Sequence, residues 1–369
     1  MSVINTNQLK SALERLCLVV PKRGTLPVLE NLQWRVVKGH LDLTATDLDN
    51  SLIIPVPWPA PPTLNVDVLV PAKDLYQAVK TEMAPTVEIK IHDSKFEVHA
   101  NKRMIEVPFV EPKNFPRIPD GELSFRGHML SSALEAALNK ALFCLSAEST
   151  RYSTDTIKLE VRESAFRVVG TDGHRLSVVE GAAKNGASEF STLLLRSTAS
   201  ILSKLSGESS WVKLSTCREE AEHNLFLLSD GSMLIARPSQ GQFPNYENVI
   251  PKAPLESRVV FQRDELLDGL TKLAPTAKKA SNSMVKLELS KSPACIKAES
   301  DGTANRVALE HARVLGKSRD IGLNHQYLTQ YVKSIETETV SMKLFPKAIS
   351  EVVVFDSFRY QHLLMPLRD

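Results

Sequence analysis

The sequence predicts an α+β protein made of three tandem copies of one domain, each with two helices packed on antiparallel sheet. Three patterns predict this fold: a leucine-rich helix, a strand pair that ends in a hydroxyl residue and an aspartate, and a closing segment with prolines. Each pattern occurs three times in the 369 residues. Leu9, Leu130 and Leu266, which hold equivalent places, lie 121 and 136 residues apart. Such a period indicates whole domains, because solenoid repeats span only about 20 to 50 residues.

The first helix of each copy is predicted by leucines that recur on one helix face after a polar start. These helices cover 5–16 with Leu9, Leu13 and Leu16, 126–138 with Leu130, Leu134 and Leu138, and 262–273 with Leu266, Leu270 and Leu273. A second, shorter helix follows in each copy at 71–80, 195–205 and 323–333. We expect the apolar face of each helix to pack on the sheet.

Two alternating strands joined by a short polar turn lie between the two helices of each copy. The pairs are 32–37 with 40–44, 157–161 with 165–169, and 285–289 with 294–298. They end in Thr46-Asp47, Thr171-Asp172 and Ser300-Asp301. Carboxylates that repeat once per domain do not converge on one metal ion. We therefore expect these aspartates to accept hydrogen bonds from nearby backbone in turns.

Each copy closes with extended chain that contains proline, at 114–119, at 242–251 and at 363–369. Proline cannot donate to a strand ladder, and it favours an extended conformation in the residue before it. The first two segments are natural linkers. The predicted domains are therefore 1–120, 121–250 and 251–369.

The composition predicts a protein of the cytoplasm that is not held in a membrane. Mean hydropathy is −0.13, and no apolar run approaches the roughly 20 residues of a membrane helix. The first 16 residues are polar and lack the apolar region of a secretory signal. The sequence has four well-separated cysteines, Cys17, Cys144, Cys217 and Cys295, whose spacing forms no metal-binding pattern. We expect them to be core thiols in a reducing compartment. The net charge of +2 gives no strong field for nucleic acid.

No catalytic motif appears in the sequence. Phosphate-binding glycine loops, a nucleophile elbow and metal-binding histidine patterns are all missing. The segment TDGHRL at 171–176 places His174 near Asp172 and allows a general-base reading. A tight turn that uses Gly173 at positive φ is the favoured reading, since neighbouring Asp and His residues rarely meet as a dyad. We predict no catalytic residue, metal site or cofactor.

Several segments together resemble the bacterial beta sliding clamps, the processivity subunits of DNA polymerase III. They are TLPVLENL at 25–32, TDLD at 46–49, NFPR at 114–117, TRY at 150–152, VGTDGHRLSVV at 169–179, QFPNYENVIP at 242–251, GLNHQYL at 322–328 and LMPLR at 364–368. The resemblance covers essentially the whole chain. It implies a crescent of three clamp domains, and a homodimer closed head to tail into a ring around duplex DNA. A ring holds DNA by enclosure, so the low net charge is no objection.

The resemblance also implies two sets of functional residues. A cleft between the second and third domains would dock peptides of the polymerase III alpha subunit, the clamp loader and other proteins, and would comprise Thr154, Thr171, Gly173, His174, Arg175, Leu176, Pro244, Asn248, Val249, Ser350, Leu363, Met365, Pro366, Leu367 and Arg368. The DNA would be met by Arg23, Arg151 and Tyr152, and by cations on or beside the helices, namely Lys10, Arg15, Lys73, Lys80, Arg126, Lys140, Arg196, Lys204, Lys272 and Lys333.

Some residues depart from the family pattern. Asn248 stands where arginine is frequent, Asp369 where an apolar residue is usual, Thr156 where glycine is common, and Ser153 where a second aromatic is expected. These departures predict an altered peptide preference or weaker docking, as in an unusual lineage or a second clamp copy. Two rivals remain: a metal-dependent nuclease or nucleotidyltransferase, and a nucleic-acid binder that forms no ring. The resemblance places the protein in the bacterial cytoplasm, at the nucleoid.

Overall fold

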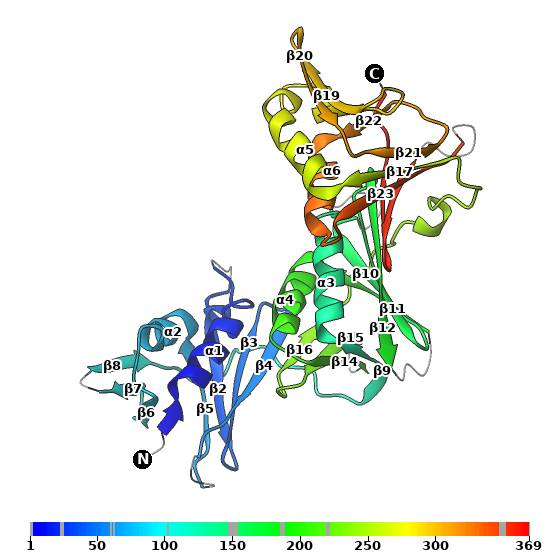
Figure 1. Ribbon diagram of the computed structural model, residues 1–369. Coiled ribbons are helices and arrows are strands. Elements are labelled where there is room, and N and C mark those ends of the chain that lie inside the picture. Colours follow the sequence, from blue (N-terminus) through cyan, green and yellow to red (C-terminus); the bar gives the residue numbers. More distant parts are fainter. Residues whose placement is uncertain are drawn as a thin grey trace.

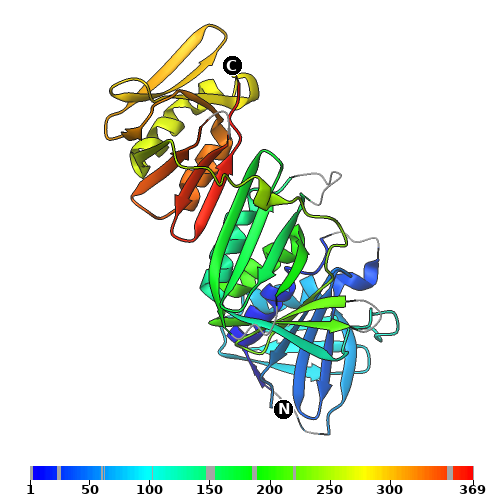
Figure 2. The same ribbon diagram turned by 90° about the vertical axis from the view of Figure 1, so that its right-hand side faces the viewer.

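The computed structural model describes residues 3–22, 26–59, 61, 63–101, 103–146, 154–184, 189–218, 222–346 and 352–368. Figure 1 shows three domains that follow one another along an arc, with the helices on its concave side. In Figure 2, where the right-hand side of Figure 1 faces the viewer, strands form the face nearest the viewer. Every strand pair is antiparallel, as the sequence predicts.

The first domain begins its first helix where Asn5 caps it, with the Asn5 Oδ1 accepting the N–H of Gln8 at 3.1 Å. Leu9, Leu13 and Leu16 are fully buried, as predicted. Its elements are β1 Val3–Asn5, α1 Thr6–Leu16, η1 Pro27–Glu30, β2 Asn31–Val37, β3 His40–Thr46, β4 Asn50–Val56, β5 Val66–Pro71, α2 Ala72–Lys80, β6 Thr86–Ile91, β7 Lys95–Ala100 and β8 Arg103–Pro108.

The second domain corrects one prediction, because the helix expected over 126–138 starts only at Ser131. Residues 123–130 form a strand that pairs with β14 (Trp211–Arg218), and Leu130 is 58% exposed. The true helix buries Leu134 and Leu138. The elements are β9 Leu123–Leu130, α3 Ser131–Leu142, β10 Thr156–Val161, β11 Ala165–Thr171, β12 Arg175–Lys184, β13 Phe190–Leu195, α4 Arg196–Gly207, β14 Trp211–Arg218, β15 Glu222–Leu228, β16 Met233–Ala236 and, in the following linker, η2 Tyr246–Asn248.

The third domain follows the predicted helices and strands closely. Asn324 caps its second helix by accepting the N–H groups of Gln326 and Tyr327. Its elements are β17 Ser257–Gln262, α5 Arg263–Ala277, η3 Ser281–Ser283, β18 Met284–Glu288, β19 Ala294–Ser300, β20 Thr303–Leu309, β21 Arg313–Gly316, β22 Ile321–Asn324, α6 His325–Ser334, β23 Thr339–Leu344, β24 Val353–Ser357 and β25 Tyr360–Leu364.

Both domain junctions are closed by strand pairing. The first domain joins the second where β4 pairs with β16, and the second joins the third where β12 pairs with β25. In the described part of the chain, β8 and β20 are each paired on one side only and so form sheet edges. The hydrogen-bonded strands therefore run without interruption from the first domain into the third.

Two of the three repeated aspartates have the predicted turn role. Asp47 Oδ1 accepts the N–H groups of Asp49 and Asn50. Asp172 Oδ1 accepts those of His174 and Arg175 at 2.9 and 3.0 Å. Asp301 differs, because its turn is shorter and places it at φ 51°, next to Gly302 at φ 75°. Two central residues at positive φ make this a type I′ hairpin turn.

Candidate peptide-binding cleft

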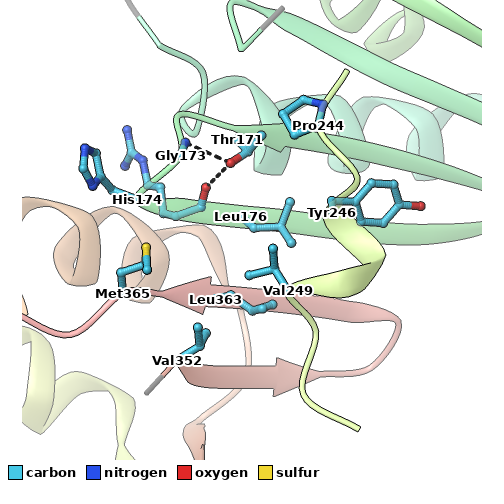
Figure 3. A pocket seen from close by; sticks show the side chains of 11 residues that line it. Thr171, Gly173, His174, Leu176, Pro244, Tyr246, Val249, Val352, Leu363 and Met365 are labelled. Carbon is cyan, nitrogen blue, oxygen red and sulfur yellow. Dashed lines mark hydrogen bonds between the residues drawn. The ribbon is translucent and has the colours of Figure 1, made fainter. Parts of the chain in front are cut away.

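A small apolar cleft lies where β12, β25 and the linker after β16 meet (Figure 3). Its cavity volume is about 100 Å³. The lining residues are Thr171, Gly173, His174, Arg175, Leu176, Pro244, Tyr246, Val249, Val352, Leu363 and Met365. The cleft therefore draws on two domains and on the linker between them.

The turn between β11 and β12 forms the wall of the cleft nearest the second domain. The Thr171 hydroxyl donates to the carbonyl oxygen of Arg175 at 2.6 Å and accepts the N–H of Gly173 at 3.1 Å (Figure 3). Gly173 has φ +88°, and a Cβ added there would meet nothing within 4 Å. Glycine is thus favoured here by backbone conformation, since left-handed φ is costly for other residues.

The floor of the cleft is apolar and is shared between the domains. Leu176 lies opposite Leu363 in the pairing of β12 with β25. Both are buried with Val352 in one hydrophobic cluster. Figure 3 shows these three side chains turned toward Val249, which is 45% exposed. An apolar side chain of a ligand would find partners on several sides here.

The C-terminal strand supplies the wall nearest the third domain. The Met365 N–H donates to the carbonyl oxygen of His174 at 2.9 Å, which extends the β12–β25 ladder by one bond. The Met365 side chain is 49% exposed and lies in the cleft beside His174 (Figure 3). Methionine adapts its shape readily, which suits a surface that receives different apolar anchors.

Tyr246 fixes the linker that carries Pro244 and Val249. Its hydroxyl donates to Glu160 Oε2 at 3.0 Å and accepts from Arg167 Nη1 at 3.0 Å. Burial raises the pKa of Tyr246 to about 12, although the Arg167 guanidinium opposes the shift. The phenol therefore stays neutral and holds the linker against the outer strands β10 and β11.

Arg175 ties the cleft to the concave side of the arc. Its Nε donates to Asp172 Oδ2 at 2.9 Å, and its Nη1 donates to Gln330 Oε1 on α6. The guanidinium carbon lies 4.1 Å from the ring centroid of Tyr327, in cation–π contact. The side chains of Arg175 and Asp172 are only 7% and 10% exposed. This arginine thus bridges the second and third domains beneath the cleft.

The structure brings most of the predicted cleft residues together. Thr154 is buried apart from the lining, Asn248 is exposed on η2, and Arg368 is exposed beyond β25. After Met365 the chain follows the third domain, where the Leu367 N–H donates to the carbonyl oxygen of Gly322 at 2.9 Å. Pro366 connects Met365 in the cleft to this bond. Ser350 lies outside the described residues.

Two lining residues, Tyr246 and Val352, were missed by the sequence reasoning. Tyr246 belongs to the segment QFPNYENVIP, where an aromatic residue with polar neighbours on both sides was the available signal. Val352 precedes β24 and gives no comparable signal.

The predicted DNA-facing residues differ in where the structure places them. Those that lie on five of the six described helices and are mostly exposed are Lys10, Lys73, Lys80, Arg196, Lys204, Lys272 and Lys333. Arg126 is instead on β9, where its Nε donates to the Thr216 hydroxyl. Arg15 was expected to face DNA, but it is buried at the first junction and pairs with Asp230 at 2.6 Å. Arg23, Arg151 and Tyr152 lie outside the described residues.

Lys140 occupies the same place at the second junction that Arg15 occupies at the first. Each is the tenth residue of its helix, α1 or α3. Lys140 Nζ lies 5.2 Å from the ring centroid of Tyr360 in the third domain. The tenth residue of α5 is Lys272. These three cations therefore mark one repeated position beside the junction strands.

Among the described residues, no group of three or more His, Cys, Asp or Glu side chains could hold a metal ion. Cys144 Sγ and His362 Nδ1 come within 3.9 Å of each other, but both are buried. Burial raises the pKa of the Cys144 thiol and lowers the pKa of His362 to about 3, so both groups stay neutral.

The described helices include none long and apolar enough to cross a bilayer.

The repeated two-helix domain, the arc with helices on its concave side and the cleft at the second junction define a DNA clamp fold. Family models match in chain order: the N-terminal domain of the DNA polymerase III beta subunit at residues 2–119, the central domain at 129–245 and the C-terminal domain at 247–368. The chain belongs to the DNA polymerase III beta subunit family, which confirms the resemblance seen in the sequence.

Individual relatives agree with the family models. The beta sliding clamp of Pseudomonas aeruginosa is 25% identical over 376 residues, which cover 99% of each chain. The Thermotoga maritima beta subunit has a TM-score of 0.87 at 20% identity and full coverage of both chains. A C. crescentus beta sliding clamp, solved with polyethylene glycol in its proposed beta-motif tethering region, has a TM-score of 0.87 at 22% identity and covers 100% of this chain and 98% of that one.

Proposed function

We propose that two copies of this chain close head to tail into a ring around duplex DNA, and that the cleft tethers the replicative polymerase and other proteins by short peptides. The ring itself catalyses no reaction. Domain boundaries near 120 and 250 fit this function, because both fall in linkers between junction strands. The proposed setting is the bacterial cytoplasm, at the nucleoid.

The observation that carries the ring is the repeated junction, together with the edge strands β8 and β20 that correspond to its two sides. Ser51 lies opposite Ile235 at the first junction, and Leu176 lies opposite Leu363 at the second. By their place in each domain, β4 and β12 correspond to β20, while β16 and β25 correspond to β8. Pairing of β20 in one copy with β8 in the other would repeat the same contact. Two such contacts close six domains into a cyclic assembly in which every junction has the same strand pairing.

The helices of the concave side support contact with DNA. Lys73, Lys80, Arg196, Lys204 and Lys333 lie exposed on three of them and are spread along the arc. We propose that these cations, with Lys10, Lys140, Lys272, Arg126, Arg23 and Arg151, attract the DNA weakly and without regard to its sequence, and that Tyr152 also contacts it. Weak contacts suit a sliding ring, because each phosphate contact made by Lys or Arg adds to the affinity that must be released.

The cleft suits an apolar peptide anchor better than a polar metabolite. Leu176, Leu363 and Val352 form its floor, and Val249 and Met365 stand exposed at its sides. Buried apolar anchors dominate the energy of such docking. The exposed Asn248 on the same linker is the position where arginine is frequent in the family, so we propose weaker or altered peptide docking. The loader and the polymerase III alpha subunit are the proposed partners.

Retention on DNA tests the ring. The clamp is loaded on nicked circular duplex with a clamp loader, then separated from free protein by gel filtration, before and after the circle is cut. We expect retention on the circle and loss from the linear form, with a solution mass near twice 40.9 kDa. Equal, salt-sensitive binding to both forms would indicate a nucleic-acid binder without a ring. A metal-dependent nuclease activity lost on Asp172→Ala would support the enzyme reading instead.

A further inference from the structure

The first domain junction carries a second cleft that repeats the peptide-binding cleft in position. Its cavity volume is about 430 Å³, larger than the about 100 Å³ of the cleft at the second junction. It is lined by the turn before β4, by the linker at 116–119 and by residues of β15 and β16. We refer to it as the first-junction groove.

The hydrogen bonds of the two sites correspond one by one. The Thr46 hydroxyl donates to the carbonyl oxygen of Asn50 and accepts the N–H of Leu48, as Thr171 does with Arg175 and Gly173. The Arg237 N–H donates to the carbonyl oxygen of Asp49 at 2.8 Å, which matches the Met365 bond to His174 at 2.9 Å. The groove therefore has the same backbone frame as the peptide-binding cleft.

The side chains on this frame have changed character. Arg237 takes the place of Met365, Ser51 that of Leu176, and His223 that of Val352. Ile235 and Pro116 keep the apolar character of Leu363 and Pro244. The groove thus retains one apolar strip but surrounds it with polar groups.

The charges at the groove favour a ligand that carries carboxylates. The guanidinium groups of Arg237 and Arg117 line it, against the single lining carboxylate of Asp49, and the imidazole of His223 adds a polar ring. Arg117 also pairs with Asp120 at 3.0 Å on the surface. Arginine binds carboxylates in strong, directional hydrogen bonds.

A peptide fits this set of groups better than a nucleic acid does. An extended peptide can place a side-chain carboxylate beside the arginines, a backbone N–H beside Asp49 and an apolar side chain on Ile235. A phosphate backbone offers acceptors only and would be repelled by Asp49. The lining also contains no helix residue, so the groove lies off the helical concave side that would face DNA.

We propose that the first-junction groove is a second docking site, selective for extended peptide segments that combine acidic and apolar residues. It lies beyond the function proposed above, because the peptide-binding cleft at the second junction does not include it. A ring would then present two docking sites of different chemistry on each chain.

Fluorescence anisotropy tests the site with a labelled, capped nine-residue peptide of alternating glutamate and leucine. Its neutral counterpart alternates glutamine and leucine. We expect the acidic peptide to bind the full-length protein more tightly than the neutral one. Arg237→Met should weaken binding at least about tenfold, equivalent to about 1.4 kcal/mol, since it removes hydrogen bonds to a charged group. Arg313→Met, which removes an exposed arginine from β21, should leave binding unchanged.

Three results would overturn the proposal. They are no preference for the acidic peptide, equal loss of binding in Arg237→Met and Arg313→Met, and loss of binding on Met365→Ala, which would place the peptide in the other cleft. Displacement by a short single-stranded oligonucleotide would assign the groove to nucleic acid instead. Retention on circular DNA, measured on the same Arg237→Met protein, keeps this outcome separate from the proposed ring.

Discussion

Replacement of Arg175 by methionine would expose the energetic role of the bridge beneath the cleft. Asp172, whose side chain is only 10% exposed, loses its charge partner. The hydrogen bond from Arg175 to Gln330 and the contact of Arg175 with Tyr327 are lost as well. Losing one partner of a buried ion pair costs about 3 to 5 kcal/mol, because the other charge stays buried. We expect Arg175→Met to lower the free energy of unfolding by about 3 kcal/mol.

A second substitution separates the free-energy cost of an unpaired buried charge from the cost of lost packing contacts. In the double variant Arg175→Met with Asp172→Asn, the asparagine oxygen can still accept the two turn N–H groups that Asp172 Oδ1 accepts now. No unpaired charge remains, so the double variant should recover at least about 1 kcal/mol relative to Arg175→Met alone. Urea unfolding followed by circular dichroism gives both values. The reasoning is refuted if the double variant is as unstable as the single one.

Three further predictions address the linker, the buried histidine and the proposed dimer. Tyr246→Phe removes the hydroxyl bonded to Glu160 and Arg167 and should cost about 1 to 2 kcal/mol in urea unfolding, whereas an unchanged midpoint would show that the linker is held by packing alone. The pKa of His362 is lowered to about 3, so its neutral form stabilises the fold above about pH 6.5, and stability should fall by up to about 1.4 kcal/mol per pH unit as the pH drops from there toward 3. His362→Gln should flatten that part of the pH profile, and an unchanged profile would assign the acid sensitivity elsewhere. Lys272→Glu should raise the dissociation constant of the dimer about tenfold in analytical ultracentrifugation, because Lys272 repeats the junction position of Arg15 and Lys140. Lys333→Glu on α6 serves as the control. An equal effect of the two substitutions would contradict the repeated junction position.

The repeated fold was predictable because each domain needs the same apolar faces. Leu9, Leu134 and Leu266 are buried, because a helix with one apolar face must pack that face against the sheet. The start of α3 was not predictable by spacing alone, since Leu130 falls at the helical interval from Leu134 but ends β9. Pairing of β9 with β14, a long-range contact, decides between the two conformations.

The cleft was predictable where one segment supplies several of its residues. Thr171 to Leu176 form a turn that is readable from Asp172 and Gly173. The contribution of Val352 depends on how the third domain docks against β12, which no local pattern encodes. Arg15 shows the same limit, because its partner Asp230 is distant in the sequence.

The edges β8 and β20 carry a consequence for self-assembly. Head-to-tail contacts close into a ring only if each junction rotates the next domain by the angle that a ring requires, which is about one sixth of a circle for six domains. Arg15 at the first junction and Arg175 at the second link neighbouring domains and so help to hold that angle. A substitution there could leave the contact between copies intact and still convert closed rings into open filaments.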